Sequence, residues 1–206
     1  MRDANRDRRR SAVAALGLAV LLIIAPALAL TAEYRIFPNG TAYQGTVQVE
    51  NADRFEFAEV GLLGERIPVQ VTGVSLSGNC SPCTFTWNDR SVITFPSGNY
   101  TVRYTGPITQ NHLVVAFPEP YRVMVRVPPG LDVRNRLLGV ISPAGAEVSE
   151  EKDGSLLVTW NSTRSAELRF YPPERELWLT WFGQFWIIIA IVLLLPFFLT
   201  RKRRSG

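Results

Sequence analysis

Residues 121–127 read Tyr-Arg-Val-Met-Val-Arg-Val, and this short stretch decides the fold class. A tyrosine or a valine stands at every second position, and two arginines and a methionine fill the positions between them. A period of two puts alternate side chains on opposite faces of a β-strand. One face of this strand is therefore expected to meet a core and the other to meet water, as in an antiparallel sheet.

The same alternation recurs on both sides of this strand. It appears at 55–59, 100–104 and 167–170, and no stretch between 33 and 177 has convincing helical periodicity. Turn signals lie between these stretches, at 38–40, 97–99, 128–130, 142–145 and 153–154.

These strands and turns predict one all-β domain over residues 33–171. The turn Asp153-Gly154 predicts a hairpin between Val148 and the apolar run 156–160, and Trp160 at the end of that run is expected to be buried between sheets. Many short strands with frequent turns are typical of an antiparallel sandwich, and an immunoglobulin-like arrangement is one form of it.

An apolar segment follows the arginine-rich N-terminus. It runs from Ala12 to about Leu30, and Pro26 interrupts it just before Ala27-Leu28-Ala29. Small residues in this arrangement predict signal-peptidase cleavage after Ala29, with Leu30-Thr31-Ala32 as a weaker second choice. Residues 1–32 are interpreted as a signal peptide, and an uncleaved signal anchor is the alternative because the segment approaches the length of a bilayer span.

A second apolar segment, 178–200, contains 23 residues without a charge. At a rise of about 1.5 Å per residue it is long enough to cross the hydrocarbon core of a bilayer. Its beginning carries three tryptophans that suit the headgroup level, and a basic cluster follows its end and marks the cytoplasmic side. These residues are Trp178, Trp181 and Trp186, then Arg201, Lys202, Arg203 and Arg204.

The two apolar segments predict the location of the protein. Residues 172–177 would form a short stiff neck, 178–200 a transmembrane helix and 201–206 a basic cytoplasmic tail. The chain is expected in the cell membrane as a single-pass protein with the β domain outside. It would cross twice if the first segment is not cleaved.

Charge argues against a nucleic-acid partner. The chain has 206 residues and a formal charge of +4, but residues 33–177 contain 13 basic and 16 acidic side chains, so the basicity lies at the two ends. A nucleic-acid binder would carry its basic surface on the folded domain. The expected partners are the lipid bilayer and an unknown protein or glycan.

Cys80 and Cys83 are the only cysteines in the sequence. In an exported domain an even number of cysteines predicts a structural disulfide. A thiol–disulfide or metal-handling factor is the alternative, because this spacing can lower a thiol pKa. The flanking residues read as turn and strand, not as the helix N-terminus typical of redox pairs, and His112 as the only histidine leaves too few ligands for zinc. No metal and no cofactor is therefore expected.

Four asparagines stand in Asn-x-Ser/Thr sequences, which are acceptors for glycosylation outside the cytoplasm. They are Asn39, Asn79, Asn99 and Asn161, all in or near turn signals. They are glycosylation candidates, and the alternative is ordinary turn chemistry of asparagine and serine.

No motif predicts a catalytic site. His112 precedes an apolar strand without a matching nucleophile and acid, and Glu150-Glu151 stand beside Lys152 in what reads as a polar, solvated turn. The expected function is therefore non-enzymatic: a membrane-anchored extracytoplasmic domain with an envelope-structural or binding role. Besides the redox or metal-handling alternative, an accessory subunit of a membrane complex stays open.

The second half of the chain carries a resemblance. Its motifs are the segments 121–130, 137–148, 157–161 and 167–171, which lead directly into the apolar helix. Over roughly residues 120–200 the chain resembles a family of uncharacterised archaeal membrane-anchored surface proteins, known only as a domain of unknown function. The resemblance implies an exported β domain with a C-terminal anchor, and it supplies no catalytic residues.

Overall fold

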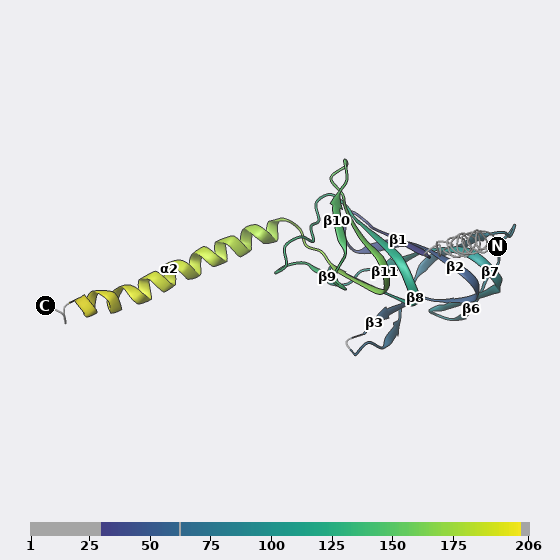
Figure 1. The fold of residues 1–206 in the computed structure, drawn as a ribbon, viewed down its shortest axis with the longest axis horizontal. Helices are drawn as coiled ribbons and strands as arrows, with labels where there is room; N and C mark the ends of the chain where they lie inside the picture. Colours follow the sequence, from purple (N-terminus) through teal and green to yellow (C-terminus); the bar gives the residue numbers. More distant parts are fainter. Residues whose placement is uncertain (1–29, 62, 203–206) are drawn as a thin grey trace, which may run out of the picture.

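The computed structural model describes residues 30–61 and 63–202, which contain eleven strands and one helix (Figure 1). The strands are β1 (Thr31–Ile36), β2 (Ala42–Glu56), β3 (Ala58–Val60), β4 (Arg66–Pro68), β5 (Thr72–Gly78), β6 (Thr86–Asp89), β7 (Val92–Pro107), β8 (His112–Val127), β9 (Val140–Ser142), β10 (Glu147–Glu150) and β11 (Leu156–Arg169), and the helix is α2 (Glu174–Lys202). The predicted signal segment up to Ala29, and Arg203 and Arg204, lie outside the described residues.

The all-β prediction is confirmed, with a correction to the pairing. Nine strands form one sheet in the order β10-β11-β8-β1-β2-β7-β5, with β6 paired to β7 and β9 to β11, and β3 and β4 form a separate hairpin. Strand β1 pairs parallel to β8, so the sheet is mixed and not purely antiparallel. The nine strands are hydrogen-bonded into one continuous sheet, whereas an immunoglobulin-like sandwich divides its strands between two sheets.

The long strands bend, and this bending makes two layers from one sheet. The ring centroids of Phe57 and Tyr104 are 4.7 Å apart. Phe57 is only two residues from Phe55, and Phe55 pairs with Ile93 of β7. Ile93 lies eleven residues from Tyr104 along β7, a distance of roughly 36 Å if the strand were straight. Phe57 can therefore reach Tyr104 only because the strands bend. The pairing of β2 with β7 is interrupted between Val49 and Arg54, where bulges allow the sheet to fold back over its own apolar face.

The core lies between these layers and collects the apolar face of every long strand. Val123, Val125 and Val127 are fully buried, as the alternation in 121–127 predicts. Trp160 is 3% exposed and its indole Nε1 donates a hydrogen bond to the Pro143 carbonyl at 2.9 Å. Its predicted burial is therefore confirmed.

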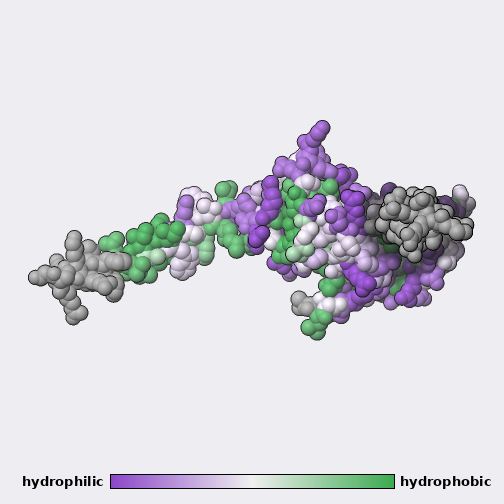
Figure 2. Space-filling view, in the orientation of Figure 1, coloured by the Kyte–Doolittle hydropathy of each residue, from purple (hydrophilic) through white to green (hydrophobic). Residues whose placement is uncertain are grey.

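Helix α2 projects from one end of the β domain, and the strand β6 lies toward the other end (Figure 1). Helix α2 begins at Glu174, directly after Pro172-Pro173, so residues 174–177 of the predicted neck are helical. Glu174 and Glu176 stand in its first turn, where negative charge is favourable for the helix dipole. Residues Glu174–Leu195 are long and apolar enough to cross a membrane, and Figure 2 shows the contrast between this helix and the hydrophilic surface of the domain.

Candidate functional site

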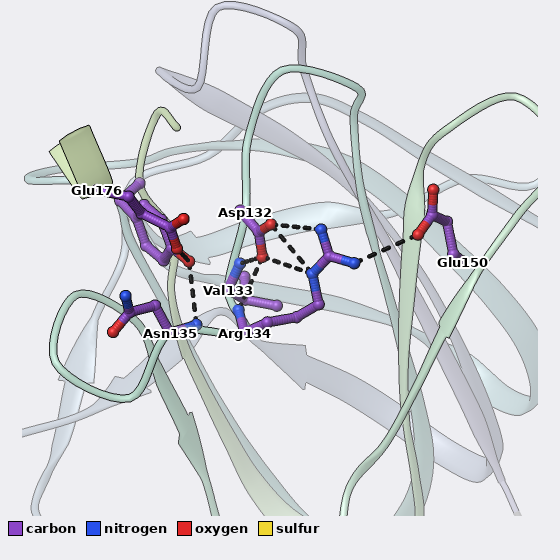
Figure 3. Close-up of polar contacts among 7 residues, drawn as sticks. Asp132, Val133, Arg134, Asn135, Glu150 and Glu176 are labelled. Carbon is purple, nitrogen blue, oxygen red and sulfur yellow. Dashed lines mark hydrogen bonds and ion pairs between the residues drawn. The ribbon is translucent and has the colours of Figure 1, made fainter. Parts of the chain in front are cut away.

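A polar cluster joins the β domain to α2, and we call it the junction. It consists of Asp132, Arg134, Asn135, Glu150, Tyr171 and Glu176, which are linked by hydrogen bonds and ion pairs (Figure 3). These residues come from the loop after β8, from β10, from the residues just after β11 and from the first turn of α2. The junction is thus the place where the direction of the helix is set relative to the sheet.

Tyr171 is the central residue of the junction and is fully buried. Its backbone exchanges two hydrogen bonds with Asp132, at 2.8 and 2.9 Å. Its hydroxyl accepts a hydrogen bond from the backbone N–H of Asn135 at 3.0 Å and donates one to Glu176 Oε1 at 2.7 Å. Burial and the hydrogen bond to Glu176 raise the pKa of Tyr171 to about 12, so the hydroxyl stays protonated and able to donate. One side chain therefore connects the end of β11, the loop after β8 and the helix.

Asp132 organises the loop that follows β8. Its Oδ1 accepts hydrogen bonds from the backbone N–H groups of Val133 and Arg134, at 2.6 and 2.8 Å. Its Oδ2 pairs with Arg134 Nη2 at 2.6 Å, and Arg134 Nη1 reaches Glu150 Oε2 at 3.3 Å. Burial would raise the pKa of Asp132, but the hydrogen bonds from Arg134 and Val133 outweigh it and lower that pKa below its ordinary value. The loop is held by a charged carboxylate.

The polar side chains of the junction contact one another and hold the loop and the helix together. Each of its carboxylates already accepts a hydrogen bond or an ion pair from a neighbour inside the cluster. Among residues 30–61 and 63–202, no three His, Cys, Asp or Glu side chains are grouped closely enough to hold a metal ion. The junction fixes the first turn of α2 against the domain.

Beyond the junction, an apolar groove of about 740 Å³ lies between α2 and the loop after β8. The helix supplies Trp178, Trp181, Phe182 and Phe185, whose spacing places them on one face, and the loop supplies Leu138. Trp178, Trp181 and Trp186 are 75%, 70% and 54% exposed, and none of the most apolar part of α2 is buried inside the protein. The predicted basic residues Arg201 and Lys202 are the last two of α2.

Cys80 and Cys83 form a disulfide in the loop between β5 and β6, with their Cα atoms 4.9 Å apart. The described residues include no free cysteine. His112 does not meet this pair: it begins β8, and its Nε2 lies 2.9 Å from Glu167 Oε1 on β11. The structure therefore keeps the cysteines apart from both the histidine and the junction.

All four predicted glycosylation asparagines are exposed. Asn39 lies in a turn and Asn79 at the bend after β5, as predicted. Asn99 and Asn161 instead lie within strands β7 and β11, where the pairing of the long strands is irregular. The side-chain oxygen of Asn99 accepts a hydrogen bond from the backbone N–H of Asn51 at 2.9 Å, so this side chain bridges the bend of the sheet.

The two neighbouring glutamates lie beside the polar turn that the sequence predicts, and Glu150 is exposed as expected, but both also take part in ion pairs. Glu150 is the last residue of β10 and belongs to the junction, whereas Glu151 lies 3.1 Å from Arg126 Nε on β8. Sequence reasoning missed the junction as a whole, because Asp132 and Tyr171 are far apart in the chain. The stiff neck predicted after Tyr171 was the one signal near it.

No curated protein matches this chain. A family model matches residues 29–202, which include every strand of the β domain and helix α2. That match covers most of the sequence, and its description states no activity. The chain belongs to this family of unknown function (DUF5803).

Proposed function

We propose that this chain is a non-enzymatic extracytoplasmic β domain, anchored in the cell membrane by α2, with a structural or binding role at the cell surface. The observation that carries the proposal is the helix itself. No residue in its most apolar 18-residue window is buried inside the protein, and such a surface is stable only in a membrane or against a partner. The resemblance of the second half of the chain to a family of archaeal membrane-anchored surface proteins implies the same role.

Helix length sets the expected depth of each tryptophan. If Arg201 marks the inner boundary, a hydrocarbon core of about 30 Å needs about 20 residues and begins near Trp181. Trp178 then lies among the outer headgroups. Trp186 lies five residues beyond Trp181, about 7.5 Å inside the hydrocarbon. We therefore assign the interfacial role, predicted for all three tryptophans, to Trp178 and Trp181 only.

The first strand favours one of the two cleavage sites. Thr31 and Ala32 belong to β1 and pair with β8 on one side, and Ala32 also pairs with Val47 of β2 on the other. Cleavage after Ala32 would remove this part of a central strand. Cleavage after Ala29 leaves β1 whole. The carbonyl of Leu30 then still accepts a hydrogen bond from the backbone N–H of Arg122 at 2.8 Å.

Membrane retention of the full chain tests the proposal. Wild-type protein is expected to stay in the membrane fraction through an alkaline wash that removes peripheral proteins. Replacing Ile191 and Leu194 by arginine places two charges inside the span, each costing about 2.5–3.5 kcal/mol, and should release the chain.

A matched control carries the same two arginines at Leu63 and Ile67 of the β3–β4 hairpin, which are 95% and 38% exposed. This variant should be retained like the wild type. Release of the wild-type chain by the wash, or full retention of the helix variant, would contradict anchoring by α2.

A further inference from the structure

The junction leaves no room for a flexible spacer between the domain and a membrane. Phe170 and Tyr171 are buried in the domain, and α2 begins three residues after Tyr171, at Glu174. Trp178 lies about 6 Å beyond Glu174 along the helix axis, and Trp181 about 10 Å. The headgroup layer of one leaflet is itself about 5–7 Å thick. If Trp181 marks the hydrocarbon boundary, the base of the β domain stands at the surface of the headgroups.

The loop after β8 presents leucines at this same level. Leu137 is 80% exposed, and Leu138 shares the apolar groove with Trp178 and Trp181. Asn135 fixes this loop: its side-chain oxygen accepts from the N–H of Leu137 at 3.0 Å, and its carbonyl accepts from Leu138 and Gly139 at 3.1 and 2.7 Å. Since the N–H of Asn135 is bound to Tyr171, the two leucines are held beside the helix.

Two arginines lie near these leucines: Arg136 precedes Leu137 in the chain, and Arg175 lines the groove together with Leu138. Arg136 and Arg175 are exposed, and neither takes part in an ion pair within the described residues. An arginine next to exposed apolar side chains suits the phosphates of lipid headgroups, which a guanidinium binds through two parallel hydrogen bonds.

We propose that this loop, residues 134–139, docks in the headgroup layer of the outer leaflet. Leu137 and Leu138 insert beside Trp178, while Arg136 and Arg175 bind lipid phosphates. The inference rests on the proposed anchoring by α2 and adds to it that the β domain lies against the bilayer in one fixed orientation. Lipid is the occupant that the groove favours, because its wall is continuous with the lipid-facing side of α2.

Depth-dependent quenching in vesicles tests this docking. The native cysteines are joined in a disulfide, so under non-reducing conditions a single introduced cysteine can be labelled with an environment-sensitive fluorophore. Three full-length variants are compared: Leu137→Cys at the loop, Ile188→Cys in the helix, and Leu63→Cys as a control at a leucine on the β3–β4 hairpin that is even more exposed than Leu137. Each is placed in vesicles of phosphatidylcholine and phosphatidylglycerol that carry a nitroxide on the headgroup or deep in the acyl chain.

The proposal expects the Leu137 label to be quenched several-fold more by the headgroup nitroxide than the Leu63 label, and the Ile188 label to be quenched by the deep nitroxide. Equal quenching at 137 and 63 with a quenched 188 would overturn the docking and leave the anchoring intact. An unquenched 188 would instead overturn the anchoring. Protection of 137 from lipid and aqueous quenchers alike, together with cross-linking to a second chain, would show that a protein covers the groove and would also overturn the proposal.

Discussion

Removing one oxygen atom, by Tyr171→Phe, tests how the domain and the helix are joined. The phenyl ring can keep the buried position of the tyrosine ring, so the change affects only the two hydrogen bonds of the hydroxyl. The N–H of Asn135 loses its acceptor, and the carboxylate of Glu176 loses its donor.

The expected loss follows from the nature of these two bonds. A neutral hydrogen bond contributes about 0.5–1.5 kcal/mol, and one to a charged group about 1.5–3 kcal/mol. Glu176 is partly exposed to water, which favours the lower part of that range. We expect the free energy of unfolding to fall by about 2–3 kcal/mol, which lowers Tm by roughly 4–12 °C for a domain of this size.

Thermal unfolding of the full chain in mild detergent, followed by the loss of β-sheet circular dichroism, measures this effect. Tyr121→Phe is the matched control: its ring is buried and stacked on Phe117 at 4.5 Å, and its hydroxyl has no hydrogen-bond partner among the described side chains. The control should change Tm little. Glu176→Gln, which keeps an acceptor but removes the charge, should lie between wild type and Tyr171→Phe. A Tyr171→Phe protein as stable as the wild type would refute the role of the hydroxyl in the junction.

Three further predictions concern the rest of the domain. Trp160→Ala should cost about 3–5 kcal/mol in equilibrium unfolding, because it empties a buried site and frees the Pro143 carbonyl, and an unchanged stability would mean that the core is packed differently. Replacing Cys80 and Cys83 by serine should cost less than about 2 kcal/mol, since the closed loop is very short, and maleimide should label the native chain only after reduction; labelling without a reductant would favour a redox role. Stability should fall at both ends of the pH scale. In acid, Asp132 has a lowered pKa when folded, so its contribution is complete above about pH 4 and is lost as the pH falls through the folded value, and Asp132→Asn should flatten this slope. In base, Tyr171 stays protonated in the folded chain up to a pKa of about 12 but ionises near 10 when unfolded, so stability should decrease between these values. Burial also raises the pKa of Tyr34, Tyr43, Tyr104 and Tyr121, so Tyr171→Phe should reduce that decrease and leave the part that these four residues cause.

The strands could be predicted because the alternation of apolar and polar residues within each strand indicates which of its faces is buried. The alternation in 121–127 and the Asp153-Gly154 turn depend only on neighbouring residues, and the structure has the strand and the hairpin where the sequence places them. Trp160 is buried for the same local reason, since it ends an apolar run on the inner face of β11.

The remaining features depend on contacts between distant parts of the chain. The parallel pairing of β1 with β8 joins segments about 90 residues apart, and no local pattern specifies such a partner. Because β1 begins at Thr31, the folded part also starts two residues before the predicted boundary at 33. The junction escaped prediction because Asp132, Glu150 and Glu176 are ordinary charged residues until the fold brings them to the base of the helix.

Two lysines allow the central claim, a β domain outside the cell on a membrane-crossing α2, to be tested on the unmodified protein. The sequence contains two lysines, Lys152 and Lys202. Lys152 is exposed on the turn between β10 and β11, and Lys202 is the last residue of α2. Intact cells are treated with a membrane-impermeant amine reagent, and the modified peptides are identified by mass spectrometry. We predict modification of Lys152 in intact cells and of Lys202 only after the cells are permeabilised. Modification of Lys202 in intact cells, or protection of Lys152 until permeabilisation, would contradict the account.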